Sequence, residues 1–320
     1  MIPDTLGLAL GLGLLLGGGQ LLVRGASALA RAFGVSPLTI GLTVVAFGTS
    51  APELSTNITA AWSGNGELSF GNIMGSNLAN IGLILAIAVL IRPFEIRRRI
   101  VTREIPMMLL ATAAAFVMAL DHALAGQPNE YGRGDGLILL LIFTVFLYYT
   151  WGDVRDQRAA EGEPDRPRQL RGRATSLLWV GLGLVGLVIG AEFTVASSVS
   201  LAGAFGISEA VIGLTLIAIG TSLPELATSV VAVARRQSEL AIGNVVGSNI
   251  LNLLLVGGLT ATTHPIPIPP GGIFDLLAVG LLSLLLLLFS ISQRGLIIRF
   301  EASMLLVIYL GYISVRTLSE

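Results

Sequence analysis

Two carboxylates stand in nearly identical surroundings within long apolar stretches of this chain. Residues 48–54 read GTSAPEL and residues 220–226 read GTSLPEL, so Glu53 and Glu225 each follow a Thr-Ser pair and a proline. If these stretches cross a membrane, each carboxylate costs roughly 2.5–3.5 kcal/mol on insertion scales. The chain has no lysine and no arginine deep in an apolar run. A bound cation is therefore the natural partner of the two charges.

The residues around each carboxylate predict further oxygen ligands. Pro52 and Pro224 lack an N–H and clash with the preceding turn, so we expect each helix to loosen there. Backbone carbonyls in 46–50 and 218–222 then lose helical partners and need protein, water or an ion. Hydroxyl oxygens in the same two segments come from Thr49, Ser50, Thr221 and Ser222.

This set of hard oxygen ligands suits Ca²⁺, which takes 6–8 of them in flexible geometry. It lacks the nitrogen and sulfur that favour Zn²⁺ or Cu²⁺. Na⁺ resembles Ca²⁺ in size and hardness, so both ions can compete for one site. The alternative interpretation is a pair of proline-kinked helices in which protonated Glu53 and Glu225 are hydrogen-bonded to their neighbours.

A second polar motif also occurs twice. Residues 71–80 read GNIMGSNLAN and residues 243–252 read GNVVGSNILN. Ser76 and Asn80 lie four residues apart and so on one helix face, as do Ser248 and Asn252. We assign these four residues to the cation site. The other asparagines of the motifs are either further ligands or hydrogen-bond links between helices, and they are Asn72, Asn77, Asn244 and Asn249.

The composition places the chain in a membrane. Of its 320 residues 53% are hydrophobic and 12% charged, with a mean hydropathy of +0.83, whereas a soluble domain has about 25% charged residues. The absence of cysteine excludes disulfides, thiolate metal sites and cysteine nucleophiles. His122 and His264 fall between apolar runs, and we interpret them as solvated loop residues rather than metal ligands.

Ten segments are long and apolar enough to span a bilayer. They are approximately residues 5–23, 37–61, 68–91, 104–121, 135–152, 174–200, 208–233, 239–262, 272–291 and 298–316. With both termini outside, 17 of the 19 basic residues, all arginines, fall on cytoplasmic connections, as the positive-inside rule requires. The exceptions are Arg133 and Arg316.

The two halves of the chain repeat each other at a constant offset of 172 residues. Between 28–54 and 200–226, 17 of 27 positions are identical without a gap. Because each half holds five predicted spans, the second copy is inserted upside down, an architecture that places the substrate site near the midplane. We therefore predict an all-α polytopic membrane protein with a first repeat at 1–152, a cytoplasmic linker at 153–173 and a second repeat at 174–320.

The paired GTS-x-PE and GN-x-x-GSN motifs closely resemble the α1 and α2 repeats of the cation/calcium antiporter superfamily, in particular its prokaryotic sodium/calcium exchangers. The resemblance covers nearly the whole chain. It implies that Glu53 and Glu225 bind Ca²⁺ and that the neighbouring Thr and Ser residues help to bind Ca²⁺ and Na⁺. It adds the carbonyls of Ala46 and Ala218 as ligands, Ser76 and Ser248 as sodium-site serines, and Asn80 as the central asparagine.

One position departs from part of that superfamily. Some archaeal members and the potassium-dependent exchangers carry Asp where this chain has Asn252, so the resemblance implies potassium independence. It also implies alternating access, in which helices 1 and 6 slide across a core of helices 2, 3, 7 and 8. Glycine-rich faces on the two sliding helices suit that movement, and they comprise Gly11, Gly13, Gly17–Gly19, Gly181, Gly183, Gly186 and Gly190.

Other functions remain open from the sequence. A proton/calcium exchanger has the same fold, although its motif typically has Asn before an Ala-Val-Glu run. An exchanger of Mg²⁺ or another divalent ion, and a cation channel, are further alternatives. An intramembrane enzyme lacks candidates, because there is no cysteine, no intramembrane histidine and no His-Glu-x-x-His motif. We expect no enzyme activity and no cofactor other than the transported Ca²⁺ and Na⁺.

The expected location and partners of the protein follow from its assignment as a membrane transporter. We expect the lipid bilayer of a prokaryotic cytoplasmic membrane, no nucleic-acid partner, and transport by a monomer, with the oligomeric state left open. Glu192 also lies in an apolar run, and its counterpart in the first repeat is Gln20. We interpret it as a proton-sensitive or packing residue rather than as a ligand. Acidic residues near the ends of the spans are expected at the membrane interface, and they are Glu67, Glu95, Glu104, Asp275 and Glu301.

Overall fold

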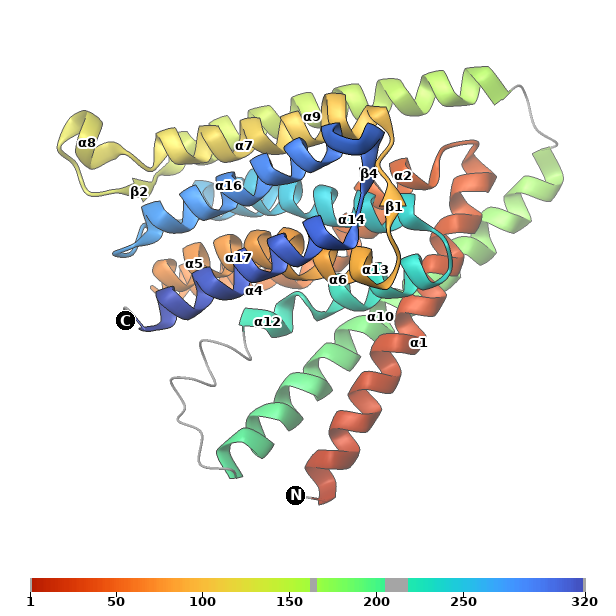
Figure 1. Ribbon diagram of the computed structural model, residues 1–320, viewed down its shortest axis with the longest axis horizontal. Coiled ribbons are helices and arrows are strands. Elements are labelled where there is room, and N and C mark those ends of the chain that lie inside the picture. Colours follow the sequence, from red (N-terminus) through yellow and green to blue (C-terminus); the bar gives the residue numbers. More distant parts are fainter. Residues whose placement is uncertain (1, 162–165, 205–217, 319–320) are drawn as a thin grey trace.

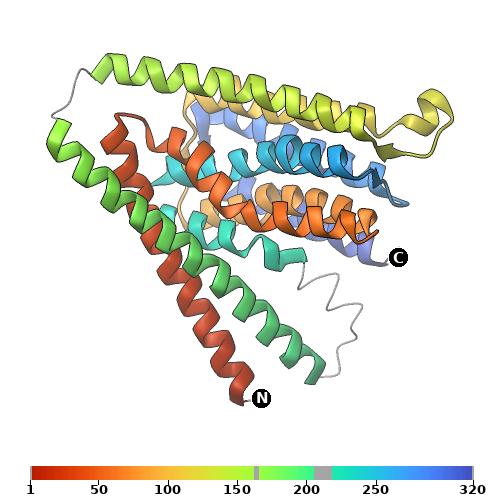
Figure 2. The same cartoon turned by 180° about the vertical axis from the view of Figure 1, so that it is seen from behind.

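The computed structural model describes residues 2–161, 166–204 and 218–318, and almost all of them are helical. Most helices run roughly alongside one another in a bundle, and two long helices cross its flank at an angle (Figure 1). The view from behind shows the same inclined pair and a third long helix lying along the opposite edge (Figure 2).

The first half contains five spans and short connecting elements. The N-terminal helix α1 covers Ile2–Phe33 and is followed by the broken helix of the first motif: α2 (Pro37–Ile40), the π-helix η1 (Gly41–Val45), α3 (Ala46–Thr49) and α4 (Ala51–Trp62). The remaining elements are α5 (Gly66–Ala79), the π-helix η2 (Asn80–Leu85), α6 (Ala86–Ile91), β1 (Phe94–Glu95), the π-helix η3 (Ile100–Glu104), α7 (Ile105–Met118), α8 (Asp121–Ala125), β2 (Glu130–Tyr131) and α9 (Arg133–Glu161).

The second half has the corresponding elements. It comprises α10 (Arg166–Ala204), α12 (Ala218–Thr221), α13 (Leu223–Ala234), α14 (Ser238–Leu251), the π-helix η5 (Asn252–Gly257), α15 (Gly258–Thr263), β3 (Ile266–Pro267), α16 (Gly272–Ile291), the 3-10 helix η6 (Ser292–Gly295), β4 (Leu296–Ile297) and α17 (Arg299–Leu318). Helices α9 and α10 extend well into the predicted linker, so the described part of 153–173 is helical rather than irregular.

The polytopic all-α fold is confirmed. Eight helices of the described residues are long and apolar enough to span a membrane. The two remaining predicted spans, 37–61 and 208–233, contain the duplicated carboxylate motif and are broken helices. Part of the latter span, residues 208–217, lies outside the described residues. The helices differ in how much of their most apolar stretch is buried within the protein. The buried share is 94% in Ser238–Thr263 and 78% in Gly66–Ile91, but only 17% in Arg133–Gln157. The helices with the second motif therefore form the centre of the bundle.

Glycines bring the central helices close together. A Cβ on Gly243 would lie 2.8 Å from the Leu38 carbonyl oxygen, and one on Gly247 would lie 2.9 Å from the Cβ of Ala46. Helix α14 thus packs directly against the helix that leads to Glu53, as expected for small residues at an interface within a membrane. This contact joins the second motif of one repeat to the first motif of the other.

Two short antiparallel strand pairs tie the connections together. Phe94 pairs with Ile297 in β1 and β4, and Tyr131 pairs with Ile266 in β2 and β3. The ten-span topology places the two members of each pair on the same side of the membrane, which is what hydrogen bonding between them requires. The sequence did not predict these strands, because runs of two residues leave no periodic pattern.

The glycine-rich faces of the first and sixth spans were expected to face the core, but most of their close contacts join these two helices to each other. The two inclined helices in Figure 1 are α1 and α10, and glycines join them to each other. A Cβ on Gly18 would lie 2.8 Å from the Gly183 carbonyl oxygen, and one on Gly190 would lie 2.9 Å from that of Gly11. Only Gly19 faces the core, against α13. Because glycine permits close backbone approach, these faces hold α1 and α10 together as a pair.

Candidate cation-binding site

The two motif carboxylates lie at equivalent helix breaks. Helix α3 ends at Thr49, Ser50 leaves helical geometry with φ −88° and ψ 4°, and α4 restarts with Pro52 and Glu53 in its first turn. Ser222 has φ −92° and ψ 4° before α13, whose first turn holds Glu225. Both breaks are where proline was expected to produce them. Each carboxylate therefore lies at a helix N-terminus, where the helix dipole stabilises negative charge.

The carbonyl of Ala46 keeps its helical partners. It accepts hydrogen bonds from the Ser50 N–H at 2.9 Å and from the Thr49 Oγ1 at 3.3 Å. The expectation that this carbonyl is released by the break is therefore wrong, because the N–H that Pro52 lacks would bond to the carbonyl of Gly48, two residues later. Its counterpart Ala218 begins α12.

The carboxylates are fully buried but differ in their partners. Glu53 is 1% exposed and Glu225 0%. Among the described residues, neither carboxylate oxygen of Glu53 has a hydrogen-bond partner. The Oε1 of Glu225 accepts from Ser50 Oγ at 3.1 Å and from Ser248 Oγ at 3.5 Å, whereas its Oε2 has no partner there. A buried polar atom without a partner is costly, so three carboxylate oxygens are available to a cation.

Hydrogen bonds join each first motif to the second motif of the other repeat. Thr49 Oγ1 donates to Asn244 Oδ1 at 3.2 Å, and its counterpart Thr221 Oγ1 donates to Asn72 Oδ1, also at 3.2 Å. The serines are also hydrogen-bonded between the repeats. The Oγ atoms of Ser50 and Ser248 lie 3.1 Å apart, and those of Ser222 and Ser76 lie 3.4 Å apart. The four predicted segments therefore meet across a pseudo-two-fold axis.

The asparagines divide into two groups. Asn72 and Asn244 accept the threonine hydrogen bonds, and Asn249 Nδ2 donates to the Asn77 carbonyl at 3.3 Å. These contacts favour the interpretation of Asn72, Asn244 and Asn249 as links between helices. The Asn77 side chain instead donates to the Ile73 carbonyl of its own helix at 2.8 Å, and its Oδ1 has no partner among the described residues. Asn80 donates to Asn249 Oδ1 at 2.9 Å.

Buried polar atoms without a partner also occur on the two asparagines assigned to the site. The Oδ1 of Asn80 and both polar atoms of the Asn252 side chain are buried without a partner among the described residues. Asn80 and Asn252 also begin the π-helices η2 and η5, a helix type that occurs frequently at functional sites.

The structure adds polar residues that sequence reasoning missed. Asn57 Nδ2 donates to the backbone carbonyl of Glu53 at 2.6 Å, and Ser69 Oγ donates to Asn57 Oδ1 at 2.9 Å. In the second repeat Asn244 Nδ2 donates to Ser229 Oγ at 3.2 Å. The i, i+4 spacing of Glu53 and Asn57 was a usable signal. These contacts fix the backbone from which the carboxylates project.

The remaining predictions about charged residues have mixed outcomes. His122 and His264 are exposed, as predicted, and so are Glu67 and Glu95. Three of the acidic residues near span ends are buried with partners within the protein, and they are Glu104, Asp275 and Glu301. Within the described residues no three His, Cys, Asp or Glu side chains cluster as a metal site, so the candidate site has two carboxylates and neutral oxygens.

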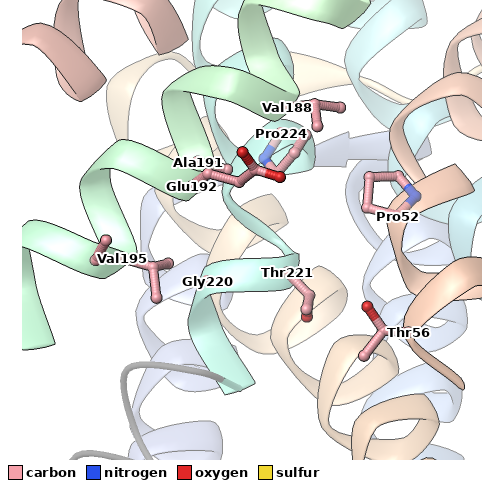
Figure 3. Close-up of a pocket in the computed structure, with 10 residues that line it drawn as sticks. Pro52, Thr56, Val188, Ala191, Glu192, Val195, Gly220, Thr221 and Pro224 are labelled. Atoms are coloured by element: carbon pink, nitrogen blue, oxygen red, sulfur yellow. The ribbon is translucent and has the colours of Figure 1, made fainter. Parts of the chain in front are cut away.

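Glu192 lines a cavity beside the site. This cavity of about 440 Å³ lies between α10, the start of α4, and the break between α12 and α13 (Figure 3). Pro52 and Pro224, which directly precede the two carboxylates, contribute to its wall together with Thr221. The cavity therefore borders both helix breaks.

Comparisons with known proteins show the family of this chain. The family model described as sodium/calcium exchanger protein matches residues 4–152 and 175–318. The sodium/calcium exchanger MaX1 of Methanosarcina acetivorans is 32% identical over 96% of this chain and 97% of its own. The inner membrane protein YrbG of Escherichia coli is 38% identical over 84% and 83%. A solved structure of the sodium-calcium exchanger NCX_Mj soaked with Na⁺ and Sr²⁺ has a TM-score of 0.85, 33% identity and 98% coverage of both chains.

Proposed function

Because this chain belongs to the sodium/calcium exchanger protein family and is a cation/calcium antiporter, we propose that it exchanges Ca²⁺ for Na⁺ without requiring K⁺. The observation that carries the proposal is the pair of fully buried carboxylates, Glu53 and Glu225, with three unpartnered oxygens between them among the described residues. The relatives are transporters rather than enzymes, and the ions are substrates.

The charge of the site supports competition between the two ions. Two carboxylates neutralise one Ca²⁺, and the same hard oxygens accept Na⁺. The proposed ligands are the carboxylates of Glu53 and Glu225, the hydroxyls of Thr49, Ser50, Thr221, Ser222, Ser76 and Ser248, the amide oxygens of Asn80 and Asn252, and the carbonyls of Ala46 and Ala218. The Ala46 carbonyl would contact the ion in place of its 3.3 Å hydrogen bond from Thr49 Oγ1. Ca²⁺ and Na⁺ cannot occupy one set of ligands together, which couples their movements in opposite directions.

The packing of the inclined helices supports alternating access. On α13, Ala227 and Val231 are buried, and both lie within 3.3 Å of a Cβ built on Gly19 of α1. The equivalent residues of α4, Ser55 and Thr59, are exposed. Helix α1 therefore covers the site on the α13 side. On the α4 side, a cavity lies between α10 and α4. With the N-terminus outside, as the arginines predict, the cavity opens to the outside.

Transport in proteoliposomes tests the proposal. Vesicles loaded with Na⁺ and diluted into Na⁺-free buffer are expected to accumulate ⁴⁵Ca²⁺, and neither Glu53→Gln nor Glu225→Gln is expected to do so. Addition of K⁺ should leave the rate unchanged. Uptake driven by an outward proton gradient but not by Na⁺ would identify a proton/calcium exchanger instead. Uptake that needs neither gradient would identify a channel.

A further inference from the structure

Glu192 is the one ionisable side chain among the described residues that line the cavity beside the site. It lies on α10, roughly 14 Å along the helix from the end of the apolar span at Leu201. Its side chain is exposed, and its carboxylate extends from α10 into the cavity (Figure 3). Ionisable residues within membrane spans are rare and mark ion pathways when they face water-filled cavities.

No partner within the protein accounts for this charge. Among the described residues Glu192 makes no hydrogen bond or ion pair. Its counterpart at the equivalent position of α1 is the neutral Gln20, whose Oε1 accepts a hydrogen bond from Arg235 Nη2 at 3.2 Å. The repeat thus places an uncompensated negative charge on the open side and a neutral, hydrogen-bonded amide on the covered side.

Helix α4, on the opposite side of the cavity, exposes more hydroxyl groups than α13, its counterpart in the second repeat. Thr56 lines the cavity and is exposed, whereas its counterpart Thr228 is buried. On the same helix α4, the exposed Ser55 and Thr59 stand where α13 has an alanine and a valine. Around Thr56, α4 therefore exposes hydroxyl groups that suit a hydrated ion.

We propose that Glu192 is an entry site, at which a hydrated divalent cation is held before it reaches Glu53 and Glu225. This proposal rests on the proposed function, because it takes the cavity as the route of the transported ion. A fixed charge in a cavity whose walls are mostly apolar raises the local concentration of the opposite ion. The attraction for Ca²⁺ is about twice that for Na⁺ in free energy, because it scales with the charge of the ion.

Exchange of external Ca²⁺ for internal ⁴⁵Ca²⁺ in Na⁺-free proteoliposomes tests the entry site without assuming which ion is coupled. For Glu192→Gln we expect the external Ca²⁺ concentration at half-maximal rate to rise about three- to tenfold at low ionic strength, with the maximal rate unchanged. The difference should shrink in high salt. Glu192→Asp retains the charge and should behave as the unchanged protein. Glu130→Gln removes an exposed charge outside the cavity and serves as the matched control.

The absence of cysteine from the chain allows the charge to be restored chemically. On Glu192→Cys, a methanethiosulfonate reagent carrying a sulfonate should lower the half-maximal Ca²⁺ concentration towards that of the unchanged protein. A reagent carrying a trimethylammonium group should raise it further. Equal values after both reagents would overturn the entry site, whatever the starting activity of the variant. If the unchanged protein exchanges Ca²⁺ for Ca²⁺ but not for Na⁺, the sodium coupling fails while the entry site remains under test.

Discussion

Glu53 and Glu225 occupy almost identical sequences but unequal surroundings. Ser50 turns its hydroxyl to Glu225 and Ser248, whereas Ser222 bonds to Ser76 and leaves Glu53 without a partner among the described residues. The inequality follows from the conformation, because the motifs themselves are equivalent. We infer that a bound cation gains most from Glu53, whose two oxygens are otherwise unsatisfied, and that Ser50 fixes the orientation of Glu225.

Replacement of Ser50 tests that role. Ser50→Ala removes the 3.1 Å hydrogen bond to Glu225 and a proposed hydroxyl ligand. A hydrogen bond to a charged group contributes about 1.5–3 kcal/mol, so we expect the Ca²⁺ concentration at half-maximal uptake to rise at least about tenfold. Ser63→Ala, at the exposed end of α4, provides the control. An unchanged half-maximal concentration in Ser50→Ala would remove this serine from the site.

Asn252 determines the charge of the proposed site. Both polar atoms of its side chain are buried without a partner among the described residues, so an aspartate there would be a third carboxylate with nothing to neutralise it. We expect Asn252→Asp to require an additional monovalent cation with Ca²⁺. The measurement is ⁴⁵Ca²⁺ uptake with and without K⁺, which should stimulate the variant but not the unchanged protein. Equal uptake by the variant in both buffers contradicts the prediction.

At the level of elements, the sequence predicted the features that depend on a local sequence pattern. The spans follow from apolar length, and the breaks at Ser50 and Ser222 follow from a proline that lacks an N–H. The duplicated polar motifs identified the segments that meet. The sequence did not predict the π-helices at Asn80 and Asn252 or the Thr49–Asn244 hydrogen bond. Those features depend on which faces of distant helices pack together.

The pairing of α1 with α10 gives a prediction about stability. A Cβ on Gly183 would lie 2.5 Å from the backbone nitrogen of Leu22, whereas one on Gly181, two residues earlier, meets nothing within 4 Å. Overpacking of this kind costs about 1–3 kcal/mol. We expect Gly183→Ala to lower the temperature of thermal unfolding in detergent by several degrees, and Gly181→Ala to leave it unchanged. Equal melting temperatures would contradict the close contact.

At the scale of the molecule, the two repeats are similar in sequence, but the long inclined helices pack differently against them. Helix α1 lies on α13, while a cavity separates α10 from α4. In a protein made of two inverted repeats, exchanging the two arrangements yields a second conformation that opens to the opposite side. Because glycine contacts hold α1 and α10 together, we infer that both helices move as one unit during this exchange.

The second conformation makes a specific contact that the present one lacks. Gly19 now lies against Val231. The offset of 172 residues converts this pair into Ala191, which lines the cavity, and Thr59, which is exposed on α4. In the cysteine-free chain, a Gly19→Cys, Val231→Cys variant should form a disulfide in the present conformation. An Ala191→Cys, Thr59→Cys variant should form one only once the α1–α10 pair has moved.

Disulfide formation is measured by gel mobility, and ⁴⁵Ca²⁺ exchange is measured before and after reduction. Each disulfide should stop exchange, because a transporter held on one side cannot complete its cycle, and a reducing agent should restore it. The pair at 59 and 191 should form faster during Ca²⁺ exchange than without Ca²⁺, since only turnover populates the second conformation. If that disulfide never forms while exchange proceeds, α10 does not close onto α4, and the symmetric exchange of conformations must be abandoned.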